Sequence, residues 1–141
     1  MTPWAPWYSF NCNTRFAGSV WAKFYRAEVI KNSDIQFSLE TIVSEDVLFN
    51  VLSFDFFDKI GYSTKAFYHY RVQDDSAQNR YRPNSMKYFG FVIDQIQQWL
   101  EEKRKDLNVK DCANTLFVHY LFGALKEDYF HKNNPNKTFA S

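Results

Sequence analysis

The sequence predicts a mainly helical α+β fold for this chain of 141 residues. Apolar residues recur every three or four positions in several segments, a spacing typical of amphipathic helices. Two short runs rich in aromatic residues flank a polar turn and indicate a pair of strands. The length suits one domain better than two. Aromatic residues make up 20% of the chain; so much ring surface must be buried, which excludes a disordered tail.

The N-terminal part of the chain predicts irregular structure followed by a short helix. Residues 1–20 contain Pro3, Pro6 and Gly18 among scattered aromatic residues, a composition typical of a loop. Residues 33–43 are mixed, and we expect a loop with a short extended piece around Phe37. Between them, residues 20–32 predict an amphipathic helix from the spacing of Trp21, Phe24, Tyr25 and Val29.

A buried helix is predicted over residues 44–59. Ser44 can cap its start, and Lys59 stands at the other end. Glu45 and Asp46 occupy the first turn, where the positive helix end favours acids. Apolar residues cover every side of this segment, namely Val47, Leu48, Phe49, Val51, Leu52, Phe54, Phe56 and Phe57.

Two strands and two further helices are predicted in the rest of the chain. Residues 60–62 and 66–72 read as strands around a polar turn, and residues 74–83 as a polar loop. A helix over 83–104 carries the apolar stripe Met86, Phe89, Ile93, Ile96 and Leu100. A last helix over 108–130, with Asn108 as its cap, turns inward Phe117, Tyr120, Leu121, Ala124 and Leu125. Residues 133–141 form a polar tail that we expect to fray.

Charge and composition exclude several classes of function. Seventeen Lys and Arg face sixteen Asp and Glu, leaving a net charge of +1, so neither nucleic acid nor a membrane patch is an expected partner. The four glycines stand far apart and cannot build a phosphate-binding loop. Cys12 and Cys112 form no zinc pattern, and we expect free thiols in a reducing cytosol. We expect no signal peptide and no transmembrane segment.

Four features carry candidate chemistry, and each also has a purely structural explanation. Capping alone explains an acidic pair after Ser44, and core packing explains Trp21 and Tyr25. An alternating strand explains the aromatic run that ends in Arg71. In order, the features are Trp21-Ala22-Lys23-Phe24-Tyr25, Ser44-Glu45-Asp46-Val47-Leu48-Phe49, Tyr68-His69-Tyr70-Arg71, and Ser76.

Taken together over residues 18–78, these features resemble the C-terminal half of family 2 glycosyltransferases, which build bacterial capsule, lipopolysaccharide and other surface glycans. The resemblance implies that residues 1–82 are part of a GT-A catalytic domain, the acceptor and base half. Residues 83–132 would be an added extension of two helices, and residues 133–141 a flexible tail. It implies transfer of a sugar from a nucleotide-diphosphate sugar to a glycan acceptor with inversion. The expected location is the cytoplasm, with peripheral attachment at the inner membrane face as an alternative.

The resemblance implies roles for the acidic pair and the first aromatic feature. Asp46 would be the general base that accepts the proton of the acceptor hydroxyl, and Glu45 would orient the acceptor. Trp21 and Lys23 would line the acceptor side.

The resemblance also implies that the two later features, Tyr68-His69-Tyr70-Arg71 and Ser76, bind the donor diphosphate and a sugar ring. Arg71 would bind the diphosphate through its planar guanidinium fork, and Ser76 would add a hydroxyl to the same group. Tyr68 or Tyr70 would offer a stacking face for a sugar ring.

Two departures from the family pattern change the expectation for this chain. Gln73 stands where some relatives have a metal-binding histidine, and His69 is a minor candidate in its place. The sequence contains no Asp-x-Asp motif; Asp74 and Asp75 are adjacent. In the intact parent that motif carries a divalent Mg or Mn. We therefore expect a truncated enzyme that is inactive and binds no metal by itself. Its donor half would be missing, and we expect poor solubility or self-association through the faces that this half would cover. The competing hypothesis is a non-catalytic helical domain that binds a protein partner.

Overall fold

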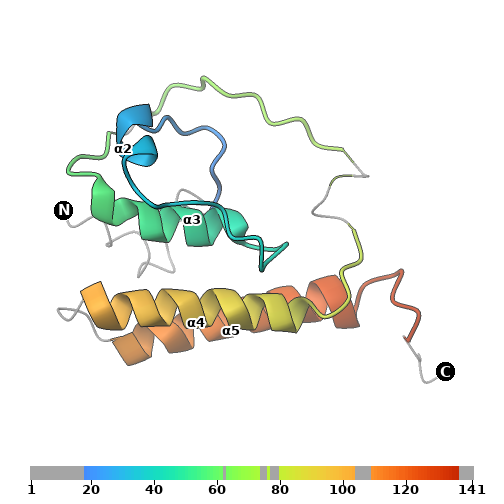
Figure 1. The fold of residues 1–141 in the computed structure, drawn as a ribbon. Coiled ribbons are helices and arrows are strands. Elements are labelled where there is room, and N and C mark those ends of the chain that lie inside the picture. Colours follow the sequence, from blue (N-terminus) through green and yellow to red (C-terminus); the bar gives the residue numbers. More distant parts are fainter. Residues whose placement is uncertain (1–17, 62, 74–75, 77–79, 104–108, 137–141) are drawn as a thin grey trace. The chain divides into compact units, whose positions relative to one another are not determined.

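The structure, a computed structural model, describes residues 18–61, 63–73, 76, 80–103 and 109–136, without the side chains of 109–113, 115 and 116. The chain divides into two compact units, Met1–His69 and Tyr70–Ser141, and each is described separately. The described residues form helices and no strand (Figure 1). Their bounds are α2 Ala27–Lys31, α3 Glu45–Ser53, the 3-10 helix η1 Phe54–Phe56, α4 Ser85–Lys103, α5 Val109–Ala124 and the π-helix η3 Leu125–Tyr129.

The first helix is shorter than predicted. Only α2 is helical within residues 20–32, and the segment before it is irregular (Figure 1). Ala22 has a φ of 57°, in the left-handed region, so a right-handed helix cannot run through it. Phe24 is 97% exposed, so the predicted apolar face does not form. The loop predicted over residues 1–17 lies outside the described residues.

The predicted helix over 44–59 is confirmed as α3, which ends at Ser53 and tightens into η1. Its buried residues are Leu48, Phe49, Asn50, Val51 and Ser53. The capping prediction is wrong, because the Ser44 side chain makes no capping hydrogen bond. Ser44 occupies the N-cap position with a φ of 57°, a conformation that strains any residue with a Cβ atom. Phe56 is exposed, so the predicted burial on every side is also wrong.

The two predicted strands do not form. Residues 60, 61 and 63–73 pair in no β-ladder, and Tyr62 lies outside the described residues. Phe67 is 70% and Val72 is 80% exposed, so this segment buries little apolar surface. A two-stranded ribbon without further strands or a packed helix has marginal stability in water. The prediction of a mainly helical fold is thus confirmed for the described residues, whereas the β part of the α+β expectation is wrong for them.

The second unit is built on a helical hairpin. The helix predicted over 83–104 is confirmed as α4, and α5 runs back antiparallel along it (Figure 1). Phe89 of α4 stacks on Tyr120 of α5 with ring centroids 4.9 Å apart. Among the hairpin side chains that the structure describes, the buried ones are Ser85, Phe89, Val92, Ile96, Trp99, Leu100, Tyr120 and Ala124. Phe117 and Met86 are half-exposed, so their predicted inward orientation is wrong.

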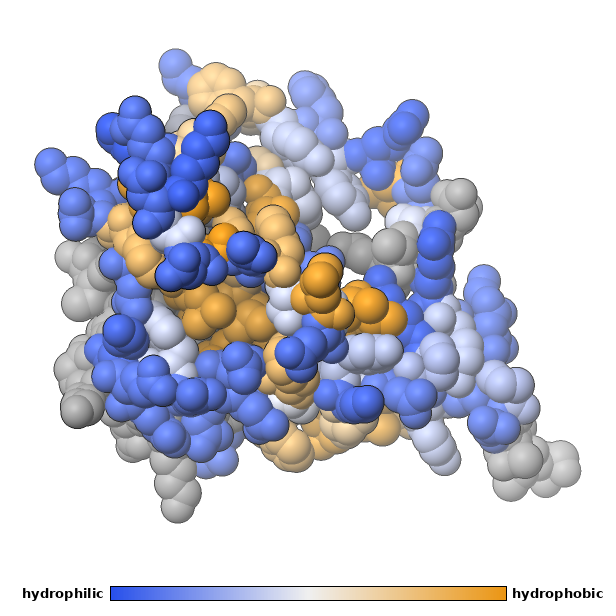
Figure 2. Space-filling model, viewed as in Figure 1, coloured by the Kyte–Doolittle hydropathy of each residue, from blue (hydrophilic) through white to orange (hydrophobic). Residues whose placement is uncertain are grey.

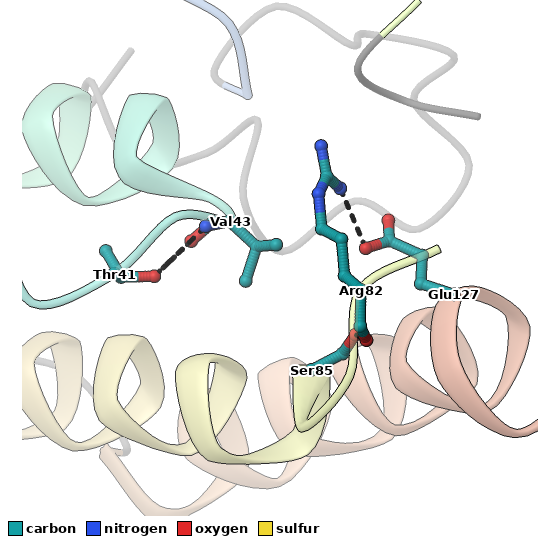
Figure 3. Close-up of polar contacts among 5 residues, drawn as sticks. All are labelled: Thr41, Val43, Arg82, Ser85 and Glu127. Atoms are coloured by element: carbon teal, nitrogen blue, oxygen red, sulfur yellow. Dashed lines mark hydrogen bonds and ion pairs between the residues drawn. The ribbon is translucent and has the colours of Figure 1, made fainter. Parts of the chain in front are cut away.

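Polar contacts close one end of the hairpin. A guanidinium nitrogen of Arg82 lies 2.9 Å from Glu127 Oε2 in η3, and the Ser85 hydroxyl donates to the Arg82 carbonyl at 2.7 Å (Figure 3). The Asp128 carboxylate accepts the Asn84 N–H at 2.9 Å, and the Asp128 carbonyl accepts the Asn134 side-chain amide at 3.0 Å. The beginning of the predicted tail is therefore tied to η3, whereas residues 137–141 lie outside the described part. Asn108, the predicted cap of α5, lies outside it as well.

Candidate functional site

The Asp46 carboxylate is half-buried in the first turn of α3, at the positive end of that helix. Its Oδ2 atom accepts the backbone N–H of Val20 at 3.2 Å, a bond between residues 26 positions apart in the sequence. Among the described residues, Oδ1 accepts no hydrogen bond. One oxygen of the carboxylate is therefore oriented by the backbone, and the other accepts no hydrogen bond from a described residue.

Lys23 brings a cation close to this carboxylate. Lys23 is half-buried, and its Nζ atom donates a hydrogen bond to the Ser19 carbonyl. Burial lowers the pKa of Lys23 from its ordinary value, and the negative charge of Asp46 acts against that shift. The family resemblance implies that Lys23 and Asp46 belong to one site. The structure places the two charges within electrostatic reach of each other, and their roles at a site stay a prediction.

Tyr25, the last residue of the first aromatic feature, also interacts with Asp46. Burial, together with the negative charge of Asp46, raises the pKa of Tyr25 to about 12. Its hydroxyl donates to Asn50 Oδ1 at 2.6 Å, and its ring meets Phe49 edge-on at 5.7 Å. Tyr25 is thus held against α3 by one polar and one aromatic contact.

Trp21 and Tyr68 form a stacked aromatic pair. Their ring centroids are 5.5 Å apart and their planes differ by 19°. Trp21 is 38% exposed and Tyr68 is 50% exposed, so the pair reaches solvent. Residues from three of the four sequence features therefore meet within the unit Met1–His69.

The remaining predicted site residues lie in several places. Glu45 is half-buried beside Asp46 in the first turn of α3, and His69 is exposed at the end of the same unit. Tyr70, Arg71 and Ser76 belong to the unit Tyr70–Ser141. The proximity of Asp46 and Arg71 stays a prediction.

Within the second unit, the residues expected at the donor diphosphate lie in an irregular segment. Arg71 is exposed, and Tyr70 is 45% exposed. The Ser76 N–H donates to the Gln73 carbonyl at 3.2 Å, which closes a turn between them. The roles of these residues at a diphosphate remain predictions.

The described residues offer no donor set for a divalent metal. No three His, Cys, Asp or Glu side chains among them lie close enough to form a metal-binding group. Carboxylate oxygens are the ligands that Mg²⁺ and Mn²⁺ prefer.

Asn50 and Ser19 belong to the site but were missed by sequence reasoning. Asn50 is fully buried, and its side-chain Nδ2 donates to the Ser19 carbonyl at 3.1 Å. A signal for Asn50 existed: an amide within an apolar helical run must find hydrogen-bond partners when it is buried. Ser19 carries no such signal, because it contributes its backbone carbonyl, which every residue has.

Ala22 and Ser44, both with a φ of 57°, lie next to Lys23 and Glu45 in the chain. Alanine and serine favour the right-handed region, so sequence could not reveal these conformations. Strained backbone of this kind occurs often at functional sites.

Comparisons with known proteins identify no family for this chain. None of the helices within the described residues is both long enough and apolar enough to span a membrane. No protein-family model, no curated protein and no solved structure matches the chain.

Proposed function

We propose that this chain forms the acceptor and base part of an inverting glycosyltransferase. The observation that carries the proposal is the arrangement around Asp46. Its carboxylate accepts the Val20 N–H and interacts electrostatically with Lys23 and Tyr25. The motifs that resemble family 2 glycosyltransferases contain these same residues, apart from Val20, which immediately precedes them.

Asp46 would act as the general base. As an acceptor hydroxyl attacks the anomeric carbon of the donor sugar, its proton passes to the carboxylate and the nucleoside diphosphate leaves. Oδ1 is the atom suited to take the proton, because Oδ2 already accepts the Val20 N–H. The Lys23 ammonium balances the negative charge of the carboxylate before the transfer. Glu45, adjacent in the same turn, would orient the acceptor.

The stacked pair of Trp21 and Tyr68 would receive the acceptor sugar. The C–H faces of a pyranose ring are apolar and pack well on aromatic rings, while its hydroxyls need polar partners at the edge. Both rings are partly exposed and belong to the same unit as Asp46. A sugar stacked on them could present a hydroxyl to the carboxylate.

The donor would be bound mainly outside this sequence. Arg71 and Ser76 would bind its diphosphate by charge-assisted and neutral hydrogen bonds. The 141 residues hold no Asp-x-Asp motif. We therefore assign the nucleotide and the divalent Mg or Mn to a separate donor-binding half, and expect no transfer from this chain alone.

A fusion experiment tests the proposal. The full chain is joined behind the donor-binding half of a family 2 glycosyltransferase, and acceptor-dependent release of nucleoside diphosphate is measured. The fusion should turn over, and Asp46→Asn should lower the rate at least about 100-fold, the range for loss of a general base. Asp34→Asn is the matched control, because Asp34 is an exposed acid of the same unit. Turnover by the chain alone, or an unchanged rate in Asp46→Asn, would contradict the proposal.

A second function, protein interaction, is favoured by apolar surface on α5 and just beyond η3. Phe117, Phe122 and Phe130 are 52%, 67% and 60% exposed. Elsewhere too apolar residues reach the surface: on the face drawn in Figure 2, hydrophobic residues lie among hydrophilic ones. Exposed aromatic surface of this kind promotes association. Sedimentation of the wild type and Phe122→Asn tests this alternative, which predicts an associating wild type and a monomeric variant.

A further inference from the structure

The peptide unit between Ser19 and Val20 links two parts of the candidate site. Its N–H, from Val20, donates to Asp46 Oδ2 at 3.2 Å. Its carbonyl, from Ser19, accepts hydrogen bonds from Lys23 Nζ and from Asn50 Nδ2. Because a peptide unit is planar and rigid, the groups that hold its carbonyl also set the direction of its N–H.

Asn50 is the buried anchor of this peptide unit. Its side chain is fully buried, donates to the Ser19 carbonyl at 3.1 Å and accepts the Tyr25 hydroxyl at 2.6 Å. The two bonds join α3 to both ends of the segment that contains Lys23. Asn50 lies one helical turn after Asp46 on the same helix. One rigid element thus carries both the acid and the amide that holds its hydrogen-bond partner.

We propose that Asn50 is a positioning residue that acts through the Ser19–Val20 peptide to fix the orientation of the Asp46 carboxylate. This inference rests on the proposed function of Asp46 as general base. With Oδ2 held by the Val20 N–H, Oδ1 points to one place, where the acceptor hydroxyl has to be. Of the two groups that hold the Ser19 carbonyl, Asn50 is fully buried in α3, whereas Lys23 is a long, flexible side chain. With Lys23 alone the peptide can rotate, and the carboxylate samples orientations in which neither oxygen meets that hydroxyl. Catalysis falls steeply with such misplacement.

The test follows the Val20 amide resonance of the full chain as a function of pH. In the wild type, this resonance should move as the Asp46 carboxylate protonates, because the N–H donates to it. In Asn50→Leu that movement should be lost, and exchange of the Val20 amide with solvent should speed up about tenfold. Asn50→Ser is a second variant in case leucine prevents folding; its side chain is one bond shorter and cannot reach as far towards the Ser19 carbonyl.

Ser53→Ala is the matched control. Ser53 is also fully buried in α3, and its hydroxyl donates to the Asn50 carbonyl at 2.9 Å without contacting the Ser19–Val20 peptide. It should keep the wild-type movement of the Val20 resonance. The same movement in all variants, or its loss in Ser53→Ala as well, would overturn the inference.

A second readout connects the peptide to the reaction. In the fusion enzyme, Asn50→Leu should lower kcat about 100-fold or more while leaving the KM for the donor unchanged; a change in donor KM alone would overturn the positioning role. The resonance experiment uses the chain by itself. Its failure is therefore distinguishable from a failure of Asp46 to act as base, which the Asp46→Asn fusion decides.

Discussion

Replacing Tyr25 with phenylalanine isolates one hydroxyl that lies between α3 and the segment containing Lys23. At neutral pH this hydroxyl donates to Asn50 Oδ1 at 2.6 Å. Removing a hydrogen-bond partner of a fully buried amide costs about 1–3 kcal/mol. We expect Tyr25→Phe to lower the free energy of unfolding by about 2 kcal/mol at pH 7, because the ring itself and its contact with Phe49 are kept.

The same hydroxyl predicts a change in stability at alkaline pH. The pKa of Tyr25 is about 12 in the folded chain, through burial and the charge of Asp46, and its ordinary value is 10.0. Between these values the unfolded chain has lost the proton and the folded chain has kept it. The free energy of unfolding therefore falls as the pH rises from 10 to 12. Two pH units correspond to about 2.7 kcal/mol, and solvent screening of this partly exposed ring reduces the effect to about 1 kcal/mol.

Urea unfolding followed by circular dichroism, at pH 7 and in steps to pH 12, measures both effects. The difference in unfolding free energy between wild type and Tyr25→Phe should be largest at neutral pH and shrink above pH 10. Tyr129→Phe is the control, because Tyr129 is 65% exposed, and its difference should stay near zero. A Tyr25→Phe variant as stable as the wild type at pH 7, or a difference that grows above pH 10, would refute the reasoning.

Two further predictions concern the backbone and the hairpin. Ser44→Gly should raise the free energy of unfolding by about 0.5–1 kcal/mol in a urea titration, since glycine relieves the left-handed φ of 57° and no capping bond is lost. Ser53→Gly, inside α3, is the control and should lower the free energy of unfolding. Destabilisation by Ser44→Gly would contradict the inference that the backbone of Ser44 is strained. A double-mutant cycle with Arg82→Ala and Glu127→Ala should give a coupling of about 1 kcal/mol for their ion pair, which is 2.9 Å long and mostly buried. A coupling near zero would show that the pair does not hold the end of the hairpin.

Local patterns in the sequence predicted the elements whose information is local. The apolar spacing of α4 places Phe89, Ile96 and Leu100 on its buried side, and the same periodicity predicts Tyr120 and Ala124 in α5. The position of Glu45 and Asp46 in a first helical turn was predicted from their place before an apolar run. These predictions succeed because a helix repeats every 3.6 residues and needs only neighbours in the sequence.

The predictions of the two strands and of the first helix's length failed because they depend on contacts with distant parts of the chain. A strand exists only where another strand pairs with it, and an aromatic run such as residues 66–72 contains no information on whether a partner is present. The helix predicted over residues 20–32 does not include Ala22, because the φ of this residue lies in the left-handed region, which alanine does not favour. Phe117, assigned to the core of the hairpin, is half-exposed because the face of α5 that packs is set by α4.

By itself, the sequence determined a mainly helical chain and a set of motifs in which an acidic pair, a lysine and several aromatic residues recur in order. Only the tertiary structure decided that Val20, Tyr25 and Ser19 meet Asp46 and Asn50 on α3, through hydrogen bonds that span 26, 25 and 31 residues. Such contacts depend on how the chain closes on itself and on which amide and carbonyl groups are buried together. Neither composition nor periodicity encodes that geometry, because both describe neighbours along the chain.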